Sequence, residues 1–291
     1  MNVKISLTSL RYCENMWELH RSETSHAVVR LVLLLCGLIL LAISPANAGR
    51  LEAGIFTAHD TFANRNPVRI NFQQTFDTVP IVIALADTAG SNSASIRITN
   101  VSTTGFDELI LEPDNWDGRH IQQNVHYIAV EPGRHVLPDG RVIEAGRLNT
   151  SATQFGSGFT GGTASWTTVN FSSILPTAPS VVTQIQTANS ETQAVANAPS
   201  RPHITAITRS SGISGFQVAL ERSQANSGPF PSTETIGWIA FPAGLSGTFP
   251  DTSNNNITWS AVNSTANIRG WDNGCFSHGF GQSSGTRVVV A

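Results

Sequence analysis

The chain has 291 residues, of which 40% are hydrophobic and 13% are charged, and its formal net charge is −3. This composition is typical of a globular protein with many turns. From Gly49 onward there are 13 Arg, no Lys and 17 Asp plus Glu, and 13 minus 17 gives a net charge of −4. Mild acidity without basic clusters argues against nucleic acid or an anionic membrane surface as a partner.

Residues 1–48 form an N-terminal extension that ends in a predicted signal peptide. An apolar run from Leu31 to Ile43 follows Arg30 and precedes a small-residue ending at Ala48. A positive charge, a short apolar run and an Ala-x-Ala ending are typical of a cleaved secretory signal. A membrane anchor is the alternative, but a spanning helix needs about 20 apolar residues. We therefore expect export to the cell surface or medium, with cleavage after Ala48 and no remaining membrane span.

Cysteine content indicates that the exported chain has no internal disulfide. Cys13 and Cys36 precede the cleavage position, so only Cys275 remains. The folded units must then be held together by their apolar cores alone. Cys275 either stays free, or pairs with a cysteine of another chain or of sequence beyond residues 1–291.

Downstream of the leader, apolar residues alternate with polar ones. Val68, Ile70 and Phe72 follow this pattern, and so do Ile96 and Ile98. A period of two with β-branched and aromatic residues predicts strands with one buried face. Turn-forming Gly, Asn and Ser lie between the strands, and no window shows a helical pattern. The sequence therefore predicts an all-β protein of antiparallel β-sandwiches, with about six strands in each.

The strand pattern occurs twice along the chain. Phe72 of the first occurrence and Phe171 of the second are 99 residues apart, which is a domain-sized spacing. We expect one unit at 51–146 and a second at 150–245. An Asp139-Gly140 pair between them predicts a tight hairpin.

The last part of the chain, residues 246–291, predicts the start of a third unit. Phe276 and Val288–Val290 align with Phe171 and Val181-Val182 of the second unit. This stretch supplies only the first two predicted strands of such a unit. We therefore expect a third unit that the sequence does not complete.

Several of these segments carry a family resemblance. The first unit contains Phe72-x3-Phe76-x3-Pro80-x-Val82, then Arg97–Phe106, then Tyr127–Val130. The second unit contains Gly215–Glu221 and Glu234–Ala240. Both resemble the H-type lectin domain, in the form found in lectin-like regions of exported bacterial proteins of the MSHA pilus biogenesis type. The resemblance implies six-stranded sandwiches, often assembled as trimers, that bind N-acetylgalactosamine-type sugars.

The richest candidate sugar site is the stretch from residue 114 to residue 120. Asp114, Trp116, Asp117 and Arg119 lie in it, and they offer carboxylates, an indole and a guanidinium. Carbohydrate sites combine planar hydrogen-bonding groups with an aromatic face. The alternative interpretation is a turn whose Trp side chain anchors it to the sandwich.

Further candidates lie in or beside the predicted strands. Asp87 directly follows a strand, where the resemblance implies an acidic sugar ligand, but Gln186 takes this position in the second unit. His126 is also a candidate ligand, although for both His126 and Arg97 a structural role is the alternative. Trp238 follows the period of its strand and is predicted to lie in the core.

No catalytic or metal-binding motif is present in the sequence. We therefore expect no enzyme, no cofactor and no metal site. The predicted function is binding of glycans in recognition or adhesion. The alternative is that the units are structural spacers of a larger surface or pilus-associated protein and bind nothing themselves.

Overall fold

The computed structural model describes residues 50–58, 67–87, 95–111, 121–137, 139–154, 164–190, 204–222, 232–250, 256–263, 279 and 288–290. In these residues every regular element is a β-strand, and the strands pair antiparallel. The predicted all-β class is therefore confirmed. The predicted signal peptide lies outside the described residues. Within the described part, no helix has the length and apolarity needed to cross a membrane.

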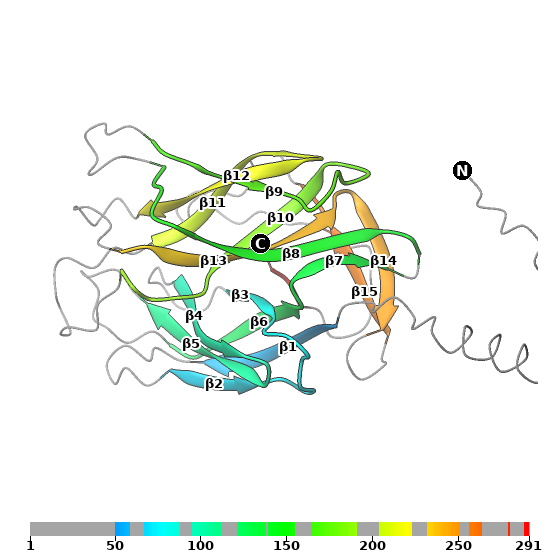
Figure 1. The fold of residues 1–291 in the computed structure, drawn as a ribbon. Helices are drawn as coiled ribbons and strands as arrows, with labels where there is room; N and C mark the ends of the chain where they lie inside the picture. Colours follow the sequence, from blue (N-terminus) through cyan, green and yellow to red (C-terminus); the bar gives the residue numbers. More distant parts are fainter. Residues whose placement is uncertain are drawn as a thin grey trace, which may run out of the picture. The chain divides into compact units, whose positions relative to one another are not determined.

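The first sandwich consists of two three-stranded sheets with the orders β1-β6-β3 and β2-β5-β4 (Figure 1). Its strands are β1 (Leu51–Ala58), β2 (Val68–Asn71), β3 (Ile81–Ala86), β4 (Ser95–Ser102), β5 (Gly105–Leu111) and β6 (Gln123–Val130). Alternate residues of both sheets face each other and form a buried core. The predicted strands at Val68–Phe72 and Ile96–Ile98 supply part of this core.

Aromatic rings fill the centre of the first core. Phe106 and Tyr127 pack edge to face with ring centroids 5.3 Å apart, and Phe72 and Phe76 pack likewise at 4.8 Å. The Tyr127 hydroxyl donates a hydrogen bond to the Glu52 carboxylate at 2.6 Å. Burial, and then the adjacent Glu52, raise the pKa of Tyr127 above its ordinary value. Tyr127 therefore stays a neutral donor that ties β6 to β1.

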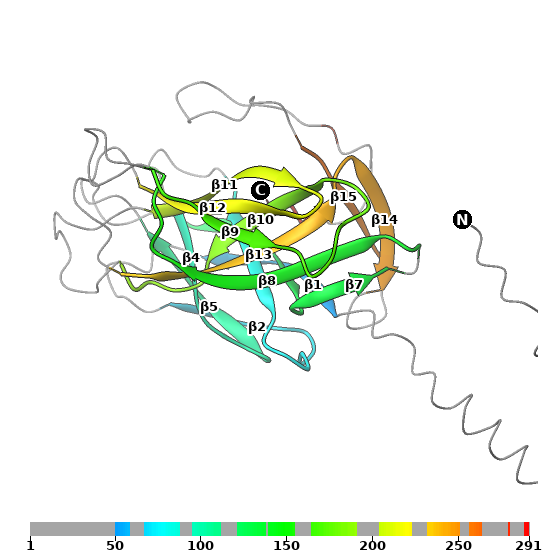
Figure 2. The same cartoon turned by 45° about the horizontal axis from the view of Figure 1, so that its top comes forward.

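The second sandwich has the sheet orders β10-β13-β8-β7 and β11-β12-β9 (Figure 2). Its strands are β7 (Gly133–Val136), β8 (Val142–Thr150), β9 (Thr167–Asn170), β10 (Pro179–Ile185), β11 (Ile204–Gly212), β12 (Gly215–Arg222) and β13 (Glu234–Pro242). The pairing of β8, β13 and β10 matches that of β1, β6 and β3, and β9, β12 and β11 match β2, β5 and β4. Trp238 is 6% exposed in the second core, as predicted.

The correspondence between the sandwiches extends to individual contacts. Glu52 of β1 accepts a hydrogen bond from the backbone N–H of Gln73 at 2.8 Å. Glu144 of β8 accepts one from the backbone N–H of Ser172 at 2.6 Å. Gln73 and Ser172 directly follow the paired phenylalanines Phe72 and Phe171. In both sandwiches, a buried glutamate thus accepts the backbone N–H of the residue after the core phenylalanine.

Glycine at the start of β5 and of β12 is required by close backbone approach. A Cβ atom on Gly105 would lie 2.1 Å from the Ile70 carbonyl oxygen, and one on Gly215 would lie 2.1 Å from that of Val169. Both distances are far below any real contact, so a side chain would push the first strand of the sheet away. Gly105-Phe106 and Gly215-Phe216 lie in the segments that resemble the lectin domain. Their glycines are therefore explained by packing within the sheets.

The β7–β8 hairpin belongs to the second sandwich. It closes at the predicted Asp139-Gly140 turn, where Gly140 has a φ of 82°, and β8 pairs with β13 along its length. The predicted unit limits at 146 and 150 both fall within β8. The division into units at 51–146 and 150–245 stays a prediction, and the hairpin lies in the same sheet as β13.

A further hairpin follows the second sandwich. It consists of β14 (Leu245–Pro250) and β15 (Asn256–Ala261). Cys275 and Phe276 lie outside the described residues, so the predicted third unit at 246–291 stays a prediction.

A third apolar cluster lies outside both sandwich cores, and we call it the central cluster. It combines the outer face of the β1-β6-β3 sheet, the outer face of the β8-β13-β10 sheet and β15. Its buried members are Leu51, Ile81, Ile83, Ile128, Val130, Leu137, Ile143, Ala145, Ile239, Phe241, Trp259 and Ala261. These faces bury each other, so both sheets have apolar residues on both faces. In an isolated sandwich the outer face of each sheet would be exposed to water and mostly polar.

One buried acid stands out in the first core. Glu108 of β5 is fully buried, lies between Val68 and Ile98 in the sheet, and neither of its carboxyl oxygens has a hydrogen-bond partner among the described residues. Burial raises the pKa of Glu108 from 4.5 to about 8. The folded state therefore holds a proton that the unfolded chain releases between these two values. Stability is highest below that window and falls as the pH rises through it.

Replacing Glu108 with leucine should remove this loss. In urea unfolding, Glu108→Leu should stabilise the chain by roughly 3 to 4 kcal/mol more at pH 8 than at pH 5, because each pH unit in the window is worth about 1.36 kcal/mol. Asp107→Asn is the control, since Asp107 is the neighbouring acid on the opposite face of β5, paired with Arg69. An equal gain at both pH values would show that Glu108 is not protonated in the fold.

Candidate functional site

One end of the first sandwich holds Asp87 and lies near His126. At this end β1 finishes at Ala58 opposite Gln123 of β6, and β3 finishes at Ala86 opposite Val125. We call it the loop end. The predicted site residues Asp114, Trp116, Asp117 and Arg119 lie outside the described residues.

Asp87 lies at the loop end with an exposed side chain. Its backbone N–H donates to the carbonyl of Asn124 at 2.8 Å, and the Asn124 side-chain amide donates to Asp87 Oδ2 at 3.1 Å. Thr57 donates in turn to Asn124 Oδ1 at 3.5 Å. These three side chains form a polar row across β1, β6 and the end of β3. Asp87 Oδ1 has no partner among the described residues and faces solvent as a free acceptor.

His126 lies on the same sheet face, two residues along β6 from Asn124. It is flanked by Ile55 on β1 and Leu85 on β3, which are 40% and 37% exposed. His126 Nδ1 accepts a hydrogen bond from the backbone N–H of Val289 at 3.3 Å. The structure thus gives His126 a structural contact beside the polar row. Arg97 also has a structural contact, because its buried guanidinium donates to the Ile204 carbonyl at 2.7 Å.

The second sandwich has a counterpart of the polar row, but there the residue that corresponds to Asp87 is buried. Gln186 donates its backbone N–H to the Thr235 carbonyl at 2.8 Å, and Thr235 donates to Asn149 at 2.8 Å. However, Gln186 is only 6% exposed, and its side-chain amide donates to the carbonyl of Val82 in the first sandwich at 3.0 Å. The position that Asp87 offers to solvent is therefore used here for packing.

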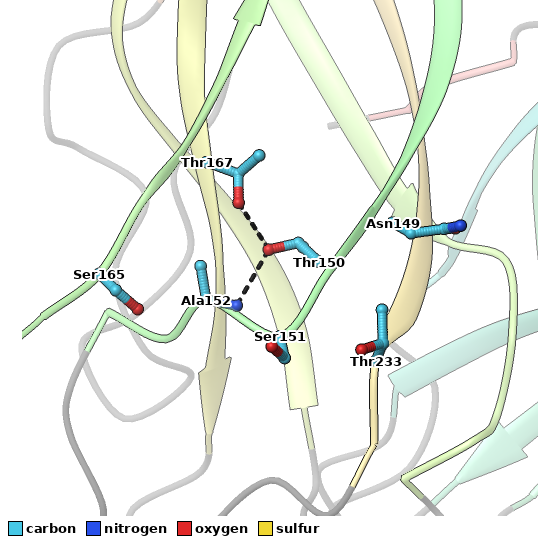
Figure 3. A pocket seen from close by; sticks show the side chains of 7 residues that line it. All are labelled: Asn149, Thr150, Ser151, Ala152, Ser165, Thr167 and Thr233. Atoms are coloured by element: carbon cyan, nitrogen blue, oxygen red, sulfur yellow. Dashed lines mark hydrogen bonds between the residues drawn. The ribbon is translucent and has the colours of Figure 1, made fainter.

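A shallow hollow of about 410 Å³ lies at the loop end of the second sandwich. It is lined by small and polar residues: Asn149, Thr150, Ser151, Ala152, Ser165, Thr167 and Thr233. Figure 3 shows the Thr150 and Thr167 hydroxyls directed at each other, and their oxygens are 2.7 Å apart. The Thr150 hydroxyl also accepts the backbone N–H of Ala152 at 2.9 Å. With these two hydroxyls bonded internally and no aromatic or charged residue in its described lining, the hollow is a poor sugar site.

The outer face of the β11-β12-β9 sheet carries an aromatic group that the sequence analysis missed. The Arg209 guanidinium carbon lies 4.0 Å from the centroid of the Trp166 ring, and Arg209 Nε donates to Gln217 at 2.8 Å. Because the guanidinium already covers one face of the indole, that face is closed to a sugar ring. Only the pairing of β9 with β12 and β11 brings these residues together.

In the described part of the chain, no cluster of three or more His, Cys, Asp or Glu side chains has the arrangement of a metal site.

Residues 67–130 match the family model of the H-type lectin domain. This stretch covers β2 to β6 and contains Asp87, Asn124 and His126. The match confirms the predicted resemblance for the first sandwich and indicates carbohydrate binding there. The resemblance of residues 150–245 stays a prediction. No curated protein and no solved structure matches the chain.

The different fates of Asp87 and Gln186 can be tested by stability. Gln186→Ala should lower the free energy of unfolding by about 1 to 3 kcal/mol, because it leaves the buried Val82 carbonyl without its donor. Asp87→Ala should change it by less than about 1 kcal/mol, since the hydrogen bond that it loses is exposed. Urea unfolding of both variants beside the parent chain measures the difference. Similar effects of the two substitutions would contradict the proposed division between an open and a packed site.

Proposed function

We propose that this protein is exported and binds carbohydrate in recognition or adhesion, without covalent chemistry. The observation that carries the proposal is the match of residues 67–130 to the H-type lectin domain. The exposed polar row at the loop end of the same sandwich supports it. The proposed ligands are glycans with N-acetylgalactosamine-type sugars, as the resemblance implies.

The polar row suits the hydroxyl groups of a sugar. Asp87 offers the oxygen Oδ1, which has no partner among the described residues, and its Oδ2 accepts a hydrogen bond from Asn124 at 3.1 Å. A carboxylate can accept hydrogen bonds from two neighbouring hydroxyls, and such charge-assisted bonds are stronger than neutral ones. In the proposal, Trp116 supplies the aromatic face, while Asp114, Asp117 and Arg119 add hydrogen bonds beside His126.

The second sandwich fits the alternative role of a structural spacer. Its counterpart of Asp87 is the buried Gln186, which is engaged with Val82. We propose that the first sandwich recognises the glycan and that the second holds and projects it. A homotrimer of such chains would raise the strength of weak contacts through multivalency.

Export rests on the sequence of the leader. The apolar run Leu31–Ile43 and the ending at Ala48 support cleavage by a signal peptidase. A place on a bacterial surface, with pilus-associated proteins, is what the family resemblance implies.

Glycan binding by the chain from Gly49 to Ala291 tests the proposal. On a glycan array at high protein concentration, the chain should bind glycans that end in N-acetylgalactosamine-type sugars. Asp87→Ala should weaken the apparent affinity at least about 10-fold, because a hydrogen bond to a charged group is worth about 1.5 to 3 kcal/mol.

Asp77→Ala is the matched control. Asp77 is also an exposed aspartate of the first sandwich, but it lies at the opposite end, in an ion pair with Arg50 at 3.4 Å. Its replacement should leave binding unchanged. Failure to bind any glycan would favour the spacer role for the whole chain, and release of new reducing ends from a bound polysaccharide would contradict the absence of catalysis.

A further inference from the structure

Three strands bring a similar short pattern, an apolar residue, a polar residue and an alanine, to the central cluster. These are Leu51-Glu-Ala53 on β1, Ile143-Glu-Ala145 on β8 and Trp259-Ser-Ala261 on β15. In each case the first and third residues pack into the cluster. Strand β15 therefore packs into the central cluster in the same way as β1 and β8 do.

The first sandwich contacts the second through a defined set of backbone carbonyls. Arg147 lies two residues after Ala145 on β8, and its Nη2 donates to the carbonyl of Pro80 at 2.7 Å and to that of Val79 at 3.1 Å. Pro80 directly precedes β3. The start of β3 is thus fixed against β8.

The second sandwich makes the same kind of contact with the chain after β15. Asn263 lies two residues after Ala261, and its Nδ2 donates to the carbonyl of Pro179 at 3.5 Å. Pro179 begins β10 and has the position in the second sandwich that Pro80 has in the first. Arg147 and Asn263 each lie two residues after the alanine of the pattern. Each donates a hydrogen bond to the carbonyl of the proline at the corresponding position of the preceding sandwich.

A contact of a different kind, from a backbone N–H to a histidine ring, connects the segment 288–290 to the first sandwich. On β13 the counterpart of His126 is Gly237, where an added Cβ would lie 2.9 Å from Ile81 of β3. On β6, His126 itself accepts a hydrogen bond from Val289 at 3.3 Å. Val288 and Val290 pack into the central cluster, as Ile81 and Ile83 do. The segment 288–290 therefore lies against the first sandwich as β3 lies against the second.

We propose that β14, β15, Asn263 and Val288–Val290 belong to a third unit, which closes a ring with the two sandwiches around the central cluster. Contacts that run from the first unit to the second, from the second to the third and from the third to the first form a closed cycle. Of the neighbouring residues Ile55, His126 and Leu85, it is His126 that contacts the proposed third unit, through Val289. This inference does not depend on carbohydrate binding.

The ring explains why apolar residues stand on the outer face of the β1-β6-β3 sheet. A strand exposed to water there would carry polar residues, as the outer face of an antiparallel sheet usually does. Phe241 and Trp259 meet in the central cluster with ring centroids 5.9 Å apart and are each 9% exposed. Each unit thus contributes one side of a shared core.

Hydrogen exchange on the chain from Gly49 to Ala291, combined with sedimentation, tests the ring. The amide of Val289 should exchange at least about 10-fold more slowly than in an unstructured peptide, and this protection should be independent of protein concentration and of the oligomeric state found by sedimentation. In His126→Ala the Val289 amide should exchange about 10-fold faster, while the amide of Ile83 is unchanged.

Val136→Ala is the control variant, because Val136 is 56% exposed and lies outside the central cluster. The measurement on the parent chain stands alone if His126→Ala does not fold. Unprotected exchange at Val289 would overturn the ring. Protection that disappears on dilution, together with an oligomer, would overturn it as well, because a second copy would then cover this surface.

Discussion

Burial of the outer sheet faces against each other is the constraint on which this structure depends. A β-sandwich of this size needs one apolar face per sheet, but the β1-β6-β3 and β8-β13-β10 sheets have apolar residues on both faces. At about 25 cal/mol per Å² of apolar surface, leaving a second face in water is costly for a small domain without disulfides. The central cluster removes that cost and fixes how the two sandwiches meet.

This packing gives equivalent positions different roles. Asp87 and Gln186 end corresponding strands and make the same backbone hydrogen bond, to Asn124 and Thr235 respectively. The neighbour decides the outcome, because Gln186 meets the Val82 carbonyl of the first sandwich whereas Asp87 meets solvent. A duplicated strand pattern therefore does not imply a duplicated binding site.

Local patterns in the sequence predicted much of this fold. Alternation at Val68–Phe72, the Asp139-Gly140 turn and the core position of Trp238 all follow from residues close in sequence, and the structure confirms them. The predicted limits inside β8 show where such patterns stop being informative, since only its pairing with β13 assigns that strand. The partner of Gln186 was equally hidden, because it lies 104 residues away in the chain. Asp114, Trp116, Asp117 and Arg119 remain predictions from the sequence.

The shared cluster should make one folding unit from the two sandwiches. Differential scanning calorimetry of the chain from Gly49 to Ala291 measures whether it does. A shared core predicts one transition, with a calorimetric enthalpy equal to the van't Hoff enthalpy. Two separate transitions, each with its own enthalpy, would show that the sandwiches unfold independently and would contradict the account.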